Sequence, residues 1–247
     1  MTAQDPASTG NTQHGKRRII FPNPICTAGT GAPDRELELL GELGPDTVMM
    51  MGDNPALPVM PTAPTLLDFF RLRFRKLTYH HVLHSAWLAR QAGQSDTVVL
   101  ACLLHDIANA ALFRADHGYW GAQLIAPYVS DEVAWAVEQH QALRFFADDS
   151  VGYAYPEAYV RFFGPDYVPP PYIQQAHAAA RKHRWYMTAR MITVYDVYSF
   201  GTDAPVGPEA FEDLIGKHFR QPTEGLGFDG SPVAHMWRSM IWPNNFL

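Results

Sequence analysis

The spacing of apolar residues after position 64 predicts a series of amphipathic helices. Leu66, Phe70, Phe74 and Leu77 recur at intervals of three or four residues, which places them on one face of a helix that begins near Thr65. Similar patterns continue along the chain. They predict further helices at about 80–92, 97–108, 116–126 and 130–146, a long helix opened by Pro169-Pro170-Pro171 and ending near 200, and a last helix at 208–218.

Residues typical of helix ends separate these segments. Gly93 follows one apolar run and is a good C-cap, because glycine adopts the left-handed conformation there without strain. Ser95 or Asp96 can cap the next helix, and Ser130 can cap the helix after Pro127. These residues support the predicted boundaries.

The rest of the chain has no comparable periodicity. No β-alternating run of useful length and no internal repeat occurs, so we predict an all-α fold with one helical bundle at 64–220. Residues 1–63 are rich in Pro, Gly, Thr and Ser and predict an irregular extension, of which about the first 18 residues are expected to be disordered. Residues 221–247 are expected to pack irregularly on the domain. Their aromatic residues could cap the core, close a pocket or form a dimer contact: Trp237, Trp242, Phe246.

The amino-acid composition limits the classes of protein to which this chain can belong. Of the 247 residues, 47% are hydrophobic and 18% charged, as in globular domains. The net charge of −6 argues against nucleic acid or an anionic membrane as a partner. No apolar run approaches the roughly 18 residues that span a bilayer, and the polar start does not resemble a signal peptide. Only two cysteines occur, Cys26 and Cys102, which fits a reducing cytoplasm.

The chemistry that stands out begins at His105-Asp106. A His-Asp dipeptide alone is weak evidence, and it could be a hydrogen-bonded pair at a helix end. Here it ends the apolar run VVLACLLHDIA, where burying an unpaired carboxylate would be costly. A metal ion removes that cost, because it supplies the opposite charge and binds imidazole and carboxylate directly.

Four further candidate ligands fall on the predicted helices: His81, His117, His140 and Asp196. Helical bundles commonly build metal sites from one inward-facing ligand on each helix. Four histidines and two aspartates suit two ions bridged by one carboxylate, with positions left open for water or substrate. Asp106 is the natural bridge.

Several of these assignments have alternatives. His80 and His84 compete with His81 for the role of ligand, and only the offset to the His-Asp pair favours His81. His84 could instead line the pocket as a proton carrier, or be a core histidine. His117 could be an exposed residue at a helix start. The basic residues that precede the first ligand are interpreted as a solvated helix face: Arg71, Arg73, Arg75, Lys76.

The whole series resembles the HD-domain superfamily over about residues 78–215. Within it, the chain is most similar to the mixed-valent diiron oxygenases, such as the 2-amino-1-hydroxyethylphosphonate oxygenases and, more distantly, myo-inositol oxygenase. The stretch from HHVLHSAWLARQ to LLHDIA resembles their first two ligand helices. DHGYWGAQLI resembles the third, and HQALRFF resembles the fourth.

This resemblance implies two iron ions, Fe(II) and Fe(III), held by the six residues. It implies O2 and a small polar, anionic substrate as partners, with O2-dependent C–H abstraction and bond cleavage. Arg144, four positions after His140, would bind the anionic group of the substrate. His84 and Asn109 would also contact the substrate, and His84 would be catalytic. A homodimer is compatible with this assignment.

The chain departs from those oxygenases at several positions. Arg71 and Phe74 stand where they carry the tyrosine and glutamate of a lid, and Thr193 stands where they carry an arginine that contacts the substrate. The gap between His105 and His117 is also shorter. We therefore expect a different substrate.

Two other functions compete with the oxygenase. A metal-dependent phosphohydrolase would use Mn, Co, Ni or Zn to cleave a nucleotide or small phosphoester. The four histidines, and Asn109 in place of a lysine or histidine after the His-Asp pair, favour the oxygenase. A catalytically silent helical scaffold is disfavoured, because every ligand position is intact.

Overall fold

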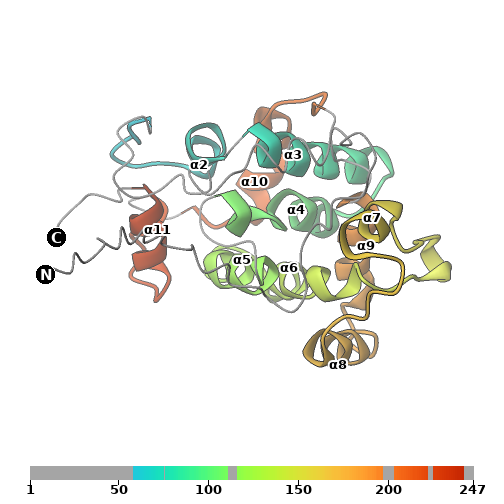
Figure 1. Cartoon of the computed structure of the whole chain (residues 1–247). Coiled ribbons are helices and arrows are strands. Elements are labelled where there is room, and N and C mark those ends of the chain that lie inside the picture. The colour runs from blue at the N-terminus through green and yellow to red at the C-terminus, as the bar shows by residue number, and fades with distance from the viewer. Residues whose placement is uncertain (1–57, 75, 111–115, 197–202, 222–224, 242–247) are drawn as a thin grey trace, which may run out of the picture.

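The computed structural model describes residues 58–74, 76–110, 116–196, 203–221 and 225–241, and this part of the chain is helical. Within it no β-strand occurs, and an isolated bridge pairs Asp148 with Tyr153. The all-α prediction is confirmed. The central bundle consists of α3 (Lys76–Gln91), α4 (Asp96–Leu104), α5 (His117–Ile125), α6 (Asp131–Leu143) and α9 (Tyr186–Asp196) (Figure 1).

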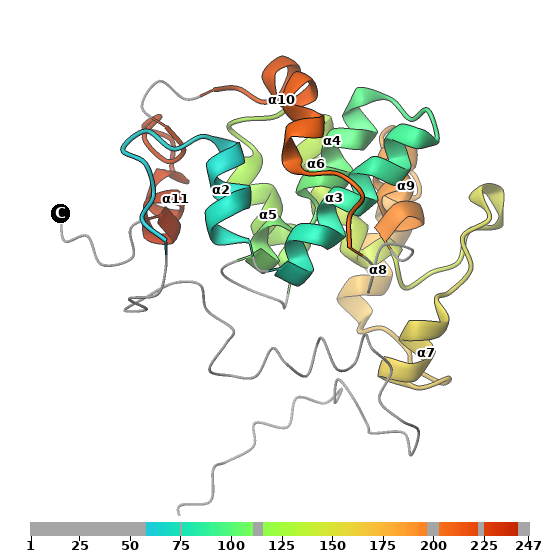
Figure 2. The ribbon, with the colours of Figure 1, turned by 90° about the horizontal axis from the view of Figure 1, so that it is seen from above.

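Four of the remaining helices flank this bundle on two sides (Figure 2), and α10 packs against α4. Figure 2 shows α2 and α11 at one side and α7 and α8 at the other. Their bounds are α2 (Leu66–Arg73), α7 (Glu157–Phe163), α8 (Pro171–Ala180), α10 (Glu212–His218) and α11 (Ala234–Ile241), with 3-10 helices at Ile107–Ala110, Asp149–Val151 and Pro208–Phe211. Of the described helices, none has both the length and the apolar character needed to cross a bilayer.

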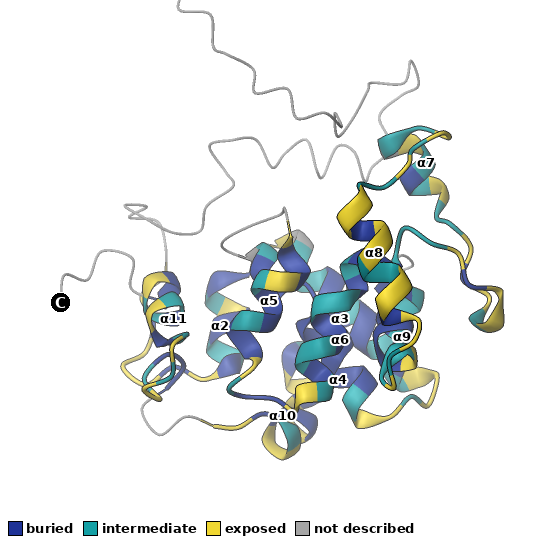
Figure 3. Ribbon diagram, turned by 90° about the horizontal axis from the view of Figure 1, so that it is seen from below, coloured by how far each residue is buried: buried dark blue, intermediate teal, exposed yellow. Residues whose placement is uncertain are grey.

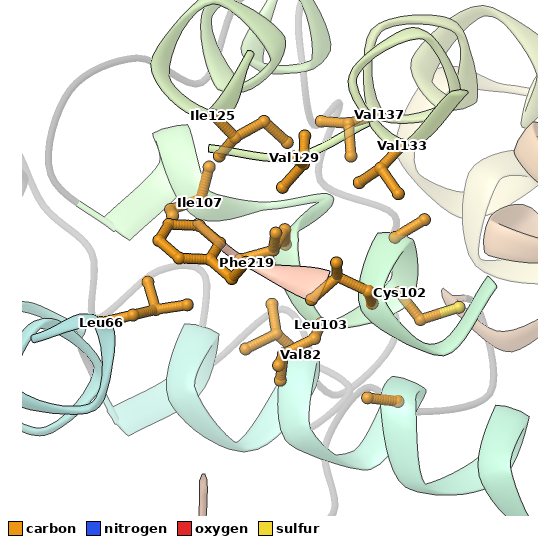
Figure 4. Close-up of a cluster of buried hydrophobic side chains, with 14 of the residues drawn as sticks. Leu66, Val82, Cys102, Leu103, Ile107, Ile125, Val129, Val133, Val137 and Phe219 are labelled. Carbon is orange, nitrogen blue, oxygen red and sulfur yellow. The ribbon is translucent and has the colours of Figure 1, made fainter. Parts of the chain in front are cut away.

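Helix α4 lies at the centre of the bundle and contacts α3, α6, α9 and α10. Each of its residues from Val98 to Leu104 is buried, as expected for a helix that is apolar on all sides. Apolar side chains from the neighbouring elements pack around it (Figure 4). Figure 3 shows the buried faces of these helices turned toward one another. The chain therefore leaves α4 at His105 inside the core.

Polar caps fix where the ligand-bearing helices start. Ser95 Oγ accepts a hydrogen bond from the Val98 amide and Ser130 Oγ from the Val133 amide, so α4 and α6 begin as predicted. Thr65 and Asp68 cap α2 reciprocally in a capping box. These bonds set the register of the helices that carry the candidate ligands.

Two predicted helices are divided in the structure. Phe74 has extended backbone and separates α2 from α3, and its ring packs on Phe69 and Phe70. The long helix expected to end near 200 is instead two helices, α8 and α9. In the turn between them the ring of His183 stacks on Trp135, with 4.0 Å between centroids. Neither break contains Gly or Pro. Residues 197–200 lie outside the described residues.

The segment after 221 was expected to be irregular, but it contains α11. Trp237 on this helix is fully buried: its ring packs edge-on against Phe69, and its Nε1 donates to the Leu124 carbonyl at 2.9 Å. Trp237 therefore caps the core, whereas Trp242 and Phe246 lie outside the described residues. Most of the predicted extension, 1–57, also lies outside them, and the boundaries at 64 and 220 stay predictions.

Arg73 was expected on a solvated helix face, and this prediction was wrong. The side chain is 2% exposed and donates to the carbonyls of Met240 and Ile241, at 3.1 and 2.8 Å. These carbonyls end α11 and have no partner within that helix, so a cation there is favourable. Met240 lies 167 residues further along the chain, and helix periodicity cannot reveal such a contact.

A second buried charge forms what we call the Arg190 cluster: Arg190, Asp148, Tyr186 and Thr193. Arg190 is fully buried on α9 and donates to Tyr186 Oη, Thr193 Oγ1 and the Leu143 carbonyl, each at 3.2 Å. Asp148 accepts a hydrogen bond from Tyr186 and lies 3.6 Å from Arg190 Nε. This cluster ties the C-terminal end of α6 to α9.

Candidate metal centre

Six polar side chains converge where the helices of the bundle meet. They come from α3, the end of α4, the start of α5, α6 and the end of α9, and each is at most 7% exposed: His81, His105, Asp106, His117, His140 and Asp196. The structure thus brings together every ligand that the sequence predicted. No packed apolar core gathers four imidazoles and two carboxylates without a compensating interaction.

One half of the cluster joins His81, His105 and Asp196. His81 Nε2 lies 3.0 Å from Asp196 Oδ1 and 3.1 Å from His105 Nε2. His105 Nε2 lies 3.5 Å from the same carboxylate oxygen. Two ring nitrogens and one oxygen therefore face a common point.

The other half joins His117, His140 and Asp106. The two histidine Nε2 atoms are 3.2 Å apart. His117 Nε2 lies 3.3 Å from Asp106 Oδ1, and His140 Nε2 lies 3.9 Å from it. This half again presents two imidazoles and one carboxylate.

Asp106 connects the two halves through its two oxygen atoms. Its Oδ2 faces the first half, at 3.4 Å from His81 Nε2 and 3.8 Å from His105 Nε2, whereas Oδ1 faces the second. Oδ1 is buried and accepts no hydrogen bond from the described residues. A buried carboxylate oxygen in this position is suited to a cation.

Backbone carbonyls fix the tautomers of two of the histidines. His105 Nδ1 contacts the Cys102 carbonyl at 2.7 Å, and His140 Nδ1 contacts the Val137 carbonyl at 2.5 Å. A carbonyl can only accept, so in both rings Nδ1 carries the proton. Each Nε2 then directs a lone pair into the cluster, which is the form in which histidine binds a metal.

The electrostatics of the cluster also favour a positive charge. Burial lowers the pKa of His81, but hydrogen bonds to Asp106 and Asp196 outweigh burial and raise that pKa to about 9. Burial raises the pKa values of both carboxyls, but the neighbouring histidines hold them well below the usual range. The raised pKa of His81 therefore reflects the demand of the two carboxylates for positive charge. A metal ion that binds here would supply that charge in place of a proton.

Close contact between α5 and α6 places His117 beside His140. A Cβ atom at Gly118 would lie 2.7 Å from the Glu138 carbonyl oxygen, so only glycine fits at this distance. The Gly118 amide also donates to Gln141 Oε1 at 3.1 Å. The helices can therefore approach until their ligand rings meet.

The structure distinguishes among the histidines of α3. His80 accepts a hydrogen bond from the Ala204 amide and lies 3.7 Å from Asp203, so His81 is the one that joins the cluster. His84 lies one turn beyond His81, and burial followed by the charge on His81 lowers its pKa. His84 is thus within electrostatic reach of the centre, but its catalytic role stays a prediction.

Two further predicted residues border the cluster. Asn109 is half-buried on the 3-10 helix after the His-Asp pair, and its Oδ1 is buried without a hydrogen-bond partner among the residues that the structure describes. Arg144 follows His140 by one helical turn, and its guanidinium lies over the ring of Tyr159. Burial lowers the pKa of Arg144, but electrostatic interactions with Tyr159, and then with Asp196 and Asp106, raise it overall. Their contacts with substrate stay predictions.

The family model of the HD domain matches residues 78–204, more than half of the 247-residue chain. The chain belongs to the HD domain family. The HD domain match spans all six clustered residues, from His81 to Asp196. HD domains are mostly metal-dependent enzymes, and the cluster of this chain consists of imidazole and carboxylate groups that can bind a metal. A comparison with curated proteins gives no match.

The residues of this HD domain fit a metal. Two groups each bring their ligand atoms within 4.8 Å of one another, near enough to hold an ion: His81, His105 and Asp196; His105, Asp106 and His140. Sequence reasoning missed Gly118 and the tyrosines around Arg144. Gly118 is marked only by its position after His117, and the tyrosines lie in a stretch without helical periodicity.

Proposed function

We propose that this HD domain is a dinuclear-iron oxygenase that acts on a small polar, anionic substrate by O2-dependent C–H abstraction and bond cleavage. The observation that carries the proposal is the division of the cluster into two halves joined by the two oxygens of Asp106. Each half has two imidazoles, and a single carboxylate could serve both ions.

The donor set of the second half supports iron. His117, His140 and Asp106 form a set of two histidines and one carboxylate, which leaves coordination positions open. This combination is typical of non-haem iron oxygenases. Imidazole donors also suit iron, zinc, nickel and copper better than magnesium or calcium, which prefer oxygen.

The protein contributes binding, orientation and exclusion of water. When bound, two irons would supply the one-electron chemistry that O2 requires. The Nδ1 contacts of His105 and His140 hold these rings in one orientation, and burial keeps bulk water out. Arg144 would hold the anionic group of the substrate, since a guanidinium matches carboxylate or phosphonate with two parallel hydrogen bonds.

A metal-dependent phosphohydrolase is the second candidate, because Arg144 would serve a phosphate equally well. It would use Mn, Co, Ni or Zn, with a bound water whose pKa is lowered by the metal. Asn109 counts against it: a neutral amide at this position supplies no additional charge to a phosphoryl group.

The test is metal analysis of protein purified without added metal, paired with low-temperature EPR before and after partial reduction. We expect about two irons per chain and a mixed-valent signal that candidate substrates perturb. Manganese, cobalt, nickel or zinc without such a signal would contradict the oxygenase. Phosphate release from nucleotides and small phosphoesters would then be the assay to run.

A further inference from the structure

Three buried hydrogen-bond donors without acceptors lie together beside the metal centre. They are Arg144 Nε, Tyr155 Oη and Tyr159 Oη, and within the described part of the chain none of the three has a partner. Arg144 ends α6, Tyr159 lies on α7, and Tyr155 lies just before α7. Buried polar atoms normally find a partner, so three unsatisfied donors in one place call for an external acceptor.

Ring contacts place these donors in one group. The guanidinium carbon of Arg144 lies 5.4 Å from the centroid of the Tyr159 ring, and the Tyr155 and Tyr159 rings are 5.9 Å apart. Tyr153 Oη donates to the Arg144 carbonyl at 2.8 Å and so holds this end of α6 in position. The donors are therefore fixed by the fold.

Aromatic side chains enclose the group. Phe145 packs against Tyr159 at 5.8 Å and against Phe163 at 5.6 Å, and Tyr167 stacks on Phe163 at 4.7 Å. Phe145, Phe163 and Tyr167 are half-buried, so the frame limits the access of water and strengthens hydrogen bonds formed inside it. It would also accommodate the apolar part of a small ligand.

The charge of this group indicates which ligand it would bind. Arg144 is cationic, and the groups that act on it electrostatically include Tyr159, Asp196 and Asp106. Metal ions would neutralise those carboxylates, which leaves the guanidinium without a counterion. A ligand for three donors and a positive charge is an anion with several acceptor oxygens.

We propose that Tyr155 and Tyr159 donate, together with Arg144, to the oxyanion group of the substrate and thereby determine its specificity. This inference rests on the proposed function, because it assigns the substrate class of the same centre. The chemistry is that of a small oxyanion, either a carboxylate or a phosphorus oxyanion. A hydroxyl retained for stability would instead hydrogen-bond to the protein.

The experiment compares Tyr155→Phe and Tyr159→Phe with Tyr167→Phe. Tyr167 belongs to the same aromatic frame, but its hydroxyl is not among the buried unpartnered atoms, so it controls for the substitution itself. Zinc-loaded protein is titrated calorimetrically with inorganic phosphate, methylphosphonate and acetate. Zinc permits no redox turnover, so binding is measured whether or not the protein is an oxygenase.

We expect the wild-type protein and Tyr167→Phe to bind at least one of these anions equally. Tyr155→Phe and Tyr159→Phe should each weaken binding about tenfold, as for a hydrogen bond to a charged group. Metal content should stay unchanged, and Tm should be equal to or higher than that of wild type, because an unsatisfied hydroxyl is removed. Arg144→Ala should weaken binding of the anion more than binding of the metal.

Binding by acetate alone would assign a carboxylate, and binding by phosphate or methylphosphonate alone would assign a phosphorus oxyanion. Equal affinity in wild type and both tyrosine variants would overturn the proposal, as would failure of wild type to bind any of the three. A fall in Tm with unchanged anion affinity would assign the tyrosines a structural role. Absence of iron in the purified protein would refute the oxygenase alone.

Discussion

Helix α9 contributes to two buried polar clusters: Tyr186, Arg190 and Thr193 belong to the Arg190 cluster, and Asp196 belongs to the metal centre. The two clusters differ in how their charges are matched. In the Arg190 cluster, Nε and Nη1 of the cation meet a carboxylate, two hydroxyls and a carbonyl that the protein itself supplies, whereas Nη2 has no hydrogen-bond partner among the described residues. In the metal centre, two carboxylates face four imidazoles, and Asp106 Oδ1 accepts no hydrogen bond from the described residues. Arg190, Asp148 and Thr193 are buried like the residues of the metal centre, whereas Tyr186 is half-buried.

This difference distinguishes buried charges that stabilise the fold from buried charges that bind an ion. A charge that is buried and matched within the chain contributes to the fold, and removal of one partner destabilises it. The metal centre is different, because its carboxylates and imidazoles direct lone pairs at common points and attract positive charge, as the raised pKa of His81 indicates. The first cluster should therefore govern stability and the second should govern ion binding.

The largest expected effect is on the metal centre. His105→Ala or Asp106→Ala should lose most of the bound metal, because each residue faces both the other ligands and the shared centre. Helix content, measured by circular dichroism, should be largely retained. His80→Ala is the control: metal analysis should find wild-type metal content, since His80 contacts Ala204 and Asp203 and not the cluster. Unchanged metal in Asp106→Ala would refute the centre.

Arg190→Ala should show the opposite result, a loss of stability without a loss of metal. It removes the cation from a buried pair, so the free energy of unfolding should fall by about 3 kcal/mol, while metal content per folded chain stays as in wild type. Urea unfolding and metal analysis of the same samples measure both. Arg181→Ala, at an exposed position, should change stability by no more than about 0.5 kcal/mol. Loss of metal in Arg190→Ala would contradict the assignment of stability to one cluster and ion binding to the other.

The pH dependence of stability should reveal Asp148. Hydrogen bonds from Ser150 and Tyr186 lower its pKa to about 2, from 3.8. A carboxyl with a depressed folded pKa contributes stability above its unfolded pKa and loses it as pH falls through the folded value. Wild type should thus exceed Asp148→Asn by on the order of 2 kcal/mol near neutral pH, with the gap closing between about pH 4 and 2. A gap that is constant over this range would contradict the assignment.

Ser130→Ala should have the smallest effect. It removes the hydroxyl that caps α6 and should cost about 1 kcal/mol of stability, measured by thermal unfolding. Because it touches neither cluster, metal content and the pH profile should match wild type. It therefore shows how the protein responds to destabilisation alone. Metal loss in Ser130→Ala would mean that ion binding merely follows stability.

Local signals in the sequence sufficed for much of the fold. Ser95 and Ser130 mark helix starts by their own hydrogen bonds, and apolar periodicity identifies the helices that build the bundle. Tertiary packing determined the rest. The break before α9 coincides with the stacking of His183 on Trp135, and the burial of Arg73 depends on the end of a helix distant in sequence.

The candidate ligands were predictable for a different reason. His105 and Asp106 end an apolar run, where polar residues are unexpected, and the spacing to the other four follows a known family pattern. Tyr155 and Tyr159 carried no such signal. Their stretch is rich in Tyr, Pro and Gly. They are distinguished by buried hydroxyls that have no hydrogen-bond partner in the described part of the chain, which only the three-dimensional structure reveals.

The contact at Gly118 has a consequence for which ions the centre can hold. The separation of His117 from His140 is set by the backbone of α5 lying against the backbone of α6, and not by adjustable side chains. Such a support cannot widen for a larger ion or contract around a smaller one. The centre should therefore discriminate between metals by radius. Even one added methyl group at this glycine would change that preference before it changed any ligand.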